Sequence, residues 1–306
     1  MSGWKQGLRL WWRAPLLIVL AWLISAIAAM PATWLLRTEL HDALKKSTAA
    51  ETMREGFDPV WYEDFSRSAD GLAGHFDPTL AGPGGALDNA ERWIDGGLMG
   101  GLPSAVPLGL LFAVVWCFFL GGVLERYVHP NLHGSFFAAT GRHGGKILCL
   151  GLISAIFYYL IYQLHGWRMD RLEERLRDVT EETTAMTATL GIYLVTLILM
   201  MIVRTIGDYA KIDVVRHEGR GVIAGWIQGV LTIVRQPFAA FSPVIVFGLL
   251  GAGALALYVA LRPSIVTPTN ASIIWVAAVG QLYLLARFGL RLGMLAVQSA
   301  ISNRGK

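Results

Sequence analysis

The sequence predicts an all-α polytopic membrane protein with six transmembrane helices, a small helical extracytoplasmic cap and amphipathic cytoplasmic segments. Of the 306 residues, 54% are hydrophobic and only 16% are charged, whereas soluble domains carry about 25% charged residues. The apolar residues gather in six stretches close to the roughly 20 residues that a helix needs to cross a bilayer core. These stretches are 14–36, 106–123, 147–164, 188–203, 241–261 and 273–290. Because they extend from end to end of the chain, we expect one membrane domain over residues 1–306.

The charges of the connecting loops alternate in sign and predict the orientation. With both termini placed in the cytoplasm, the inner segments hold 15 Lys and Arg against 4 Asp and Glu, a net charge of +11. The outer segments then carry −7, which completes the formal net charge of +4. An excess of bases on the cytoplasmic side is typical of polytopic proteins. The basic isoelectric point near 9.1 therefore reflects a face beside anionic lipid, and we expect no nucleic-acid partner.

The first apolar stretch resembles a secretory signal but is too long for one. Lys5, Arg9 and Arg13 precede it, and Ala26 and Ala28 form an A-x-A site. The apolar run continues beyond that site to Leu36, whereas a signal core has about 7–15 residues. We therefore expect an uncleaved anchor, and a localisation in the bacterial cytoplasmic (inner) membrane as a multi-pass protein.

Residues 37–103, between the first two spans, form the longest extramembrane region. Periodicity predicts helices over 38–55, from Asp58–Pro59 onward, and from near Gly85. We interpret the region as a helical cap packed on the outer membrane face. Its aromatic residues alternatively favour a partner-docking or substrate-gating surface, with Phe57, Trp61, Phe65 and Trp93 as docking candidates.

Two inner segments resemble one another and indicate a weak repeat of helix hairpins. Glu125 and Tyr127 follow the second span, and Asp208 and Tyr209 follow the fourth. Each pair precedes a short apolar helix. The second such helix, 222–234, is too short to span and is expected to lie at the surface or re-enter the membrane. On the outer side, the third span is expected to continue as a solvated helix and to turn back near residue 180.

Ionisable residues near the inner ends of the spans are the best candidates for a functional site. Such residues pair with one another, face a cavity or bind lipid phosphate. The candidate polar or lipid-phosphate cluster comprises Glu125, Arg204, Asp208, Arg287 and Arg291. The i,i+4 spacing of Arg204 and Asp208 predicts that these two side chains pair.

No pattern in the sequence supports catalysis, and we expect no cofactor and no metal. His129, His133 and His143 lie near Glu125, but Pro130 interrupts the helix that an i,i+4 zinc pair needs, so solvated loop histidines are expected. The two cysteines, Cys117 and Cys149, are expected to be free thiols.

One stretch has a familiar enzyme spacing. Asp70, Gly71, Gly84 and Asp88 resemble the CDP-alcohol phosphotransferase signature. The two outer metal ligands of that signature fall on Arg67 and Arg92, and cations at these positions would repel a divalent metal. We therefore interpret the spacing as a coincidence.

Residues 119–124 (Phe-Leu-Gly-Gly-Val-Leu) at a span end, with Asp208-Tyr209-Ala210-Lys211-Ile212 later, resemble uncharacterised bacterial polytopic inner-membrane proteins over about residues 105–240. The resemblance implies six spans and no activity. Two function classes stay open. One is a non-enzymatic scaffold or accessory subunit with protein partners in a membrane complex. The other is an ABC-type transport permease that couples to an ATPase through cytoplasmic segment 207–238.

Overall fold

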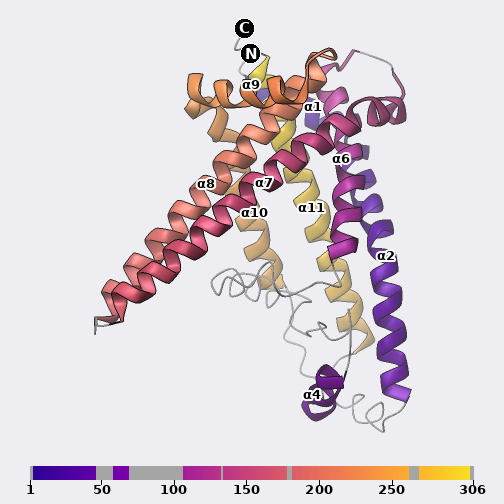
Figure 1. The fold of residues 1–306 in the computed structure, drawn as a ribbon. Helices are drawn as coiled ribbons and strands as arrows, with labels where there is room; N and C mark the ends of the chain where they lie inside the picture. Colours follow the sequence, from indigo (N-terminus) through magenta and orange to yellow (C-terminus); the bar gives the residue numbers. More distant parts are fainter. Residues whose placement is uncertain are drawn as a thin grey trace. The chain divides into compact units, whose positions relative to one another are not determined.

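The computed structural model describes residues 3–45, 58–68, 106–131, 134–177, 181–261 and 269–303, and all regular structure within these ranges is helical. The predicted all-α fold is therefore confirmed. In chain order the helices are α1 (Gly3–Trp12), α2 (Leu16–Lys45), α4 (Pro59–Ser68), α6 (Val106–Val128), α7 (Phe136–Leu176), α8 (Glu182–Arg216), α9 (Val222–Arg235), α10 (Pro237–Leu261) and α11 (Asn270–Ser302) (Figure 1).

Six of these helices are long and apolar enough to cross a membrane: α2, α6, α7, α8, α10 and α11. Each covers one predicted span, except that α2 begins two residues after the predicted start at residue 14, and most helices extend well beyond the span. α7 has 41 residues, which corresponds to about 60 Å and twice the thickness of a bilayer core. The reason is that hydropathy marks the part of a helix that lipid covers, whereas backbone hydrogen bonds continue into water. The short apolar helix expected before the third span is consequently the first part of α7.

The apolar windows of these helices are poorly covered by the protein itself. Only 11–33% of the residues in each window are buried, and Leu16, Leu249 and Ile274 expose about 70% of their surface. Soluble proteins rarely expose contiguous apolar patches of this kind. The helices therefore belong to a multi-pass membrane protein whose apolar surface contacts lipid.

The chain divides into two compact units. Unit 1 comprises Met1–Pro15, Trp116–Gly248 and Arg291–Lys306, and unit 2 comprises Leu16–Val115 and Leu249–Leu290. The best-packed core lies in unit 1. Its largest fully buried side chains include Leu124, Ile147, Leu150, Tyr209, Ile212, Leu292 and Leu295.

Within unit 1, α7 and α8 form a long antiparallel hairpin, and α9 packs across the end of the hairpin where α7 begins and α8 ends (Figure 1). Two glycines of α9 permit this approach. A Cβ atom at Gly229 would lie only 2.5 Å from the carbonyl oxygen of Ile206 and 3.2 Å from the amide nitrogen of Ala210. Trp226 completes the contact by stacking on Phe157 of α7, with ring centroids 5.4 Å apart.

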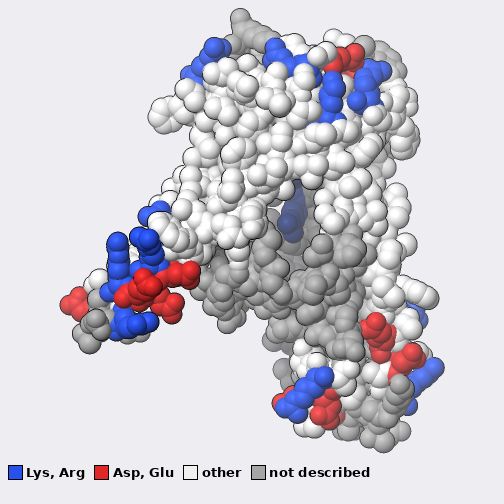
Figure 2. Space-filling view, in the orientation of Figure 1, with Lys and Arg blue, Asp and Glu red and all other residues white. Residues whose placement is uncertain are grey.

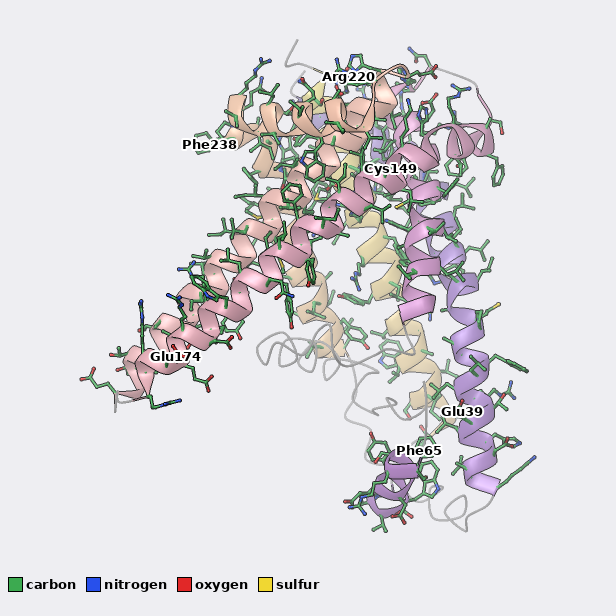
Figure 3. All side chains as sticks on the ribbon, viewed as in Figure 1. Glu39, Phe65, Cys149, Glu174, Arg220 and Phe238 are labelled. Atoms are coloured by element: carbon green, nitrogen blue, oxygen red, sulfur yellow. The ribbon has the colours of Figure 1, made fainter. Side chains whose placement is uncertain are left out.

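The charged side chains of unit 1 gather at the two ends of this hairpin. Figure 2 shows mainly Lys and Arg, with one acidic patch among them, over the end that carries α9, acids and bases mixed at the hairpin tip, and a largely uncharged surface between the two ends. Arg220 lies at the first end and Glu174 near the tip (Figure 3). The expected continuation of the third span as a solvated helix is confirmed, because α7 runs without interruption to Leu176. The expected turn near residue 180 lies outside the described residues.

In unit 2, polar side chains join the apolar helices. Trp22 of α2 donates a hydrogen bond from Nε1 to Gln281 of α11 over 2.6 Å. The rings of Tyr258 and Tyr283 stack with centroids 4.9 Å apart. Hydrogen bonds in lipid are satisfied between helices, because no water is present to replace them.

The capped start of α4 follows the sequence prediction. Asp58 Oδ1 accepts hydrogen bonds from the backbone nitrogens of Val60 and Trp61, at 3.0 and 3.1 Å, and Pro59 occupies the first helical position. The first helix expected in the cap region is, as far as Lys45, the C-terminal part of α2. The third expected helix lies outside the described residues.

Candidate functional site

A buried ion pair joins α8 to α11 in unit 1. Arg291 donates two hydrogen bonds to the Asp208 carboxylate, NH1 to Oδ2 and NH2 to Oδ1, each over 2.7 Å. The Asp208 side chain is 1% exposed and that of Arg291 is 19% exposed. Lys211 adds a second cation, with Nζ 3.7 Å from Oδ1. We call Asp208, Lys211 and Arg291 the Asp208 cluster.

The Asp208–Arg291 contact is a bidentate ion pair, the strongest geometry for an arginine and a carboxylate. A planar guanidinium matches both oxygens of a carboxylate, and hydrogen bonds between ionised groups are about twice as strong as neutral ones. Asp208 is buried deeply enough that it needs such a partner, because an isolated buried carboxylate is very costly. Asp208 thus connects α8 to α11 at this position.

The five residues of the predicted cluster do not form a single cluster in the structure. Asp208 and Arg291 come together, although the i,i+4 spacing had predicted Arg204 as the partner of Asp208. Arg204 is exposed and acts on the carboxylate electrostatically. Arg287 is exposed one helical turn before Arg291. Glu125 belongs to a separate group of side chains.

A second set of contacts, not anticipated from the sequence, anchors the end of α8. Arg216 donates hydrogen bonds to the backbone oxygens of Ser302 and Ser299, at 2.8 and 3.0 Å. These carbonyls belong to the last turn of α11, where a cation compensates unpaired acceptors. Arg220 in turn binds both oxygens of the buried Asp213, at 2.8 and 2.7 Å. The sequence shows that Arg216 and Arg220 lie near a span end, but it does not show which groups they bind.

Glu125 of α6 faces His143 of α7. Glu125 Oε2 lies 3.2 Å from His143 Nε2, with the two side chains 14% and 1% exposed. Glu218, in the loop between α8 and α9, brings its carboxylate to the same place, and the three ligand atoms all lie within 4.8 Å of one another. Arg142 binds Glu218 Oε1 over 2.7 Å. We call Glu125, His143 and Glu218 the Glu125 cluster.

The expectation of solvated loop histidines is wrong for His143. Helix α7 begins at Phe136, seven residues before it, and carries His143 into the core. His129 follows the end of α6 and is half-buried. His133 lies outside the described residues. Local spacing predicts a loop around His143, whereas α7 continues without a break from Phe136 into the third span.

The proposed docking surface is only partly described. Phe65 is buried, and its ring stacks on Trp61 with centroids 5.0 Å apart. A buried Phe65 favours the self-packed cap, because a docking residue needs an accessible side chain. Phe57 and Trp93 lie outside the described residues, as does the stretch from Asp70 to Asp88. Cys117 and Cys149 are free thiols.

The fold and these clusters define an all-helical, multi-pass membrane protein whose described buried charges are engaged in contacts within unit 1. No protein-family model, curated protein or solved structure matches the chain.

Proposed function

We propose that this protein is a non-enzymatic scaffold or accessory subunit of a membrane assembly in the bacterial inner membrane, with both termini in the cytoplasm. The observation that carries the proposal is the Asp208–Arg291 pair. A solute pathway needs polar groups that exchange partners with the solute, whereas this carboxylate has both oxygens bound by a guanidinium and is closed to solvent. Its role is to hold two spans together.

The alternative, a permease that couples to an ATPase through segment 207–238, is less well supported. Ala210 and Val214 of that segment are buried, and they pack against Val222 and Trp226 of α9. The outward face of α9 carries Ile223, Ile227, Leu231 and Val234, and Phe238 follows it (Figure 3). An apolar face of this kind is typical of a helix that lies in the headgroup layer of a membrane.

Photo-crosslinking distinguishes the two functions. Benzoylphenylalanine at position Ile227 samples the outward face of α9, and the same group at Ile198, exposed in the apolar part of α8, is the control that faces lipid. For a scaffold we expect both positions to label lipid. A stoichiometric crosslink from Ile227 to a nucleotide-binding protein would support the permease instead.

Native mass spectrometry from membranes extracted in mild detergent provides the second test. A scaffold should appear in a heteromeric assembly of fixed stoichiometry that contains no ATPase. A single chain surrounded only by lipid would contradict the subunit proposal.

The proposed orientation follows from the charge distribution. In a background without Cys117 and Cys149, an impermeant maleimide should label Glu181→Cys in intact cells and should reach Ser135→Cys only after the membrane is permeabilised. The reverse pattern would overturn the orientation.

A further inference from the structure

We infer that the Glu125 cluster is a binding site for a divalent transition-metal ion of the Zn²⁺ type, which joins α6, α7 and the α8–α9 loop. The site would take one nitrogen ligand, His143 Nε2, and one oxygen from each of Glu125 and Glu218. This metal site does not depend on the proposed scaffold function. It shares no residue with the Asp208 cluster.

The distances between the ligand atoms fit such an ion. Ligands at about 2.0–2.2 Å in tetrahedral geometry lie about 3.3–3.6 Å from one another. Glu125 Oε2 and His143 Nε2 are 3.2 Å apart. The Glu218 carboxylate lies within 4.8 Å of both and is 60% exposed, so a rotation of this flexible side chain brings it into range.

The buried side chains point to a missing ligand. His143 is 1% exposed, yet neither of its ring nitrogens has a hydrogen-bond partner in the part of the chain that the structure describes. Glu125 Oε2 also has no hydrogen-bond partner among the described residues, although it lies 3.2 Å from Nε2. The two atoms lie within ion-pair distance, but neither completes a hydrogen bond with good geometry. Because buried polar atoms are almost always satisfied, an ion between them explains the arrangement.

The donor set selects the class of metal. Two carboxylates neutralise a divalent charge, and the imidazole favours Zn²⁺ and its neighbours over Mg²⁺ and Ca²⁺, which prefer oxygen ligands. Two cations surround the exposed ligand. Arg142 binds Glu218 Oε1 and leaves Oε2 for the metal, while Lys146 donates to the backbone oxygens of Glu218 and Arg220 and so holds the loop. Second partners of this kind orient a ligating carboxylate.

With three protein ligands, a tetrahedral ion retains one position for water. Glu218 is 60% exposed, so the site lies at the edge of the protein. Metal binding would therefore fasten the α8–α9 loop to α6 and α7. Since α9 packs on α8 beyond this loop, the ion would also hold the orientation of α9.

The site can be tested on the full chain in detergent, purified without a histidine tag, treated with EDTA, and with Cys117 and Cys149 replaced by serine. Zn²⁺ binding is measured by calorimetry, and Co²⁺ binding by its visible absorption, which reports nitrogen and oxygen ligands and their geometry. We expect one ion per chain and a rise in the unfolding temperature when the ion binds.

Glu218→Gln is the decisive variant, because Glu218 is exposed and its ion pair with Arg142 contributes little to folding. We expect it to weaken Zn²⁺ binding by at least about tenfold, since even the outer partners of a metal contribute 10- to 100-fold. Glu125→Gln and His143→Gln should also abolish the rise in unfolding temperature. The matched controls are Glu63→Gln, which breaks an exposed ion pair in α4, and His129→Gln.

The proposal is refuted if the EDTA-treated protein binds neither Zn²⁺ nor Co²⁺. It is also refuted by equal affinities of the Glu218→Gln and Glu63→Gln variants, which would place the bound ion elsewhere.

Discussion

Breaking the Asp208–Arg291 pair should be among the most destabilising polar changes in this protein. Both groups are largely buried, and each carboxylate oxygen accepts a hydrogen bond at 2.7 Å. Removal of one member of a buried pair costs about 3–5 kcal/mol, mainly because the other charge stays behind without compensation. For comparison, an exposed pair such as Glu63–Arg67 contributes about 0.3–0.5 kcal/mol.

The two single variants should differ in a specific order. Arg291→Met leaves Asp208 with Lys211, whose Nζ lies 3.7 Å away. Asp208→Leu leaves both cations without the carboxylate, so it should lower the free energy of unfolding further. In the double variant no buried charge of the pair remains, and apolar replacements of a buried pair are often neutral. We therefore expect the double variant to recover the part of the loss that comes from Arg291, whereas Lys211 stays without its carboxylate partner.

Unfolding by SDS in dodecylmaltoside micelles, followed by tryptophan fluorescence, measures these free energies. Arg287→Met is the matched control, because it is the same substitution at an exposed position one turn earlier on α11, and it should change the free energy of unfolding by less than about 0.5 kcal/mol. Single variants no worse than this control, or losses that simply add in the double variant, would refute the assignment of the pair.

Three further predictions concern packing. Gly229→Ala should destabilise the α8–α9 contact, because its Cβ would approach the Ile206 carbonyl oxygen to 2.5 Å. The control is Gly191→Ala in α8, where a Cβ meets no described atom within 4 Å. In the same SDS titration this control should raise the free energy of unfolding by up to about 1 kcal/mol. Phe65→Ala should accelerate proteolysis of α4 from the outer face, whereas Val60→Ala, at a 69% exposed position, should leave the cleavage rate unchanged; equal rates would argue against a self-packed cap. Arg216→Met should increase carboxypeptidase digestion of the chain end, since Arg216 holds the last turn of α11; unchanged digestion would show that these hydrogen bonds do not secure it.

Several features followed from local sequence patterns. Asp58 before Pro59 predicted the start of α4, and the short apolar run 222–234 predicted a helix that coincides closely with α9, which ends at Arg235 before Pro237. Both signals act over a few residues, through a capping oxygen or a missing backbone N–H. The continuation of α7 toward Leu176 was likewise predicted from alternating charges that suit a solvated helix.

The pairing of polar residues could not be predicted in this way. Asp208 and Arg291 are separated by 83 positions, and the nearer Arg204 satisfied the local spacing rule equally well. Similarly, Glu218 reaches Glu125 and His143 only because α8 and α7 run side by side. Local spacing ranks neighbours on one helix, and it carries no information about which residues of another helix face them.

The sequence by itself determined that this chain forms six apolar helices long enough to cross a membrane, because the length and composition of each segment set its preference for lipid. The tertiary structure decided which charges are buried and which partners they have. Packing of α6, α7, α8 and α11 removes Asp208 and His143 from solvent. A buried polar group requires a partner wherever the fold places it, so the Asp208 cluster and the Glu125 cluster exist only in the assembled bundle.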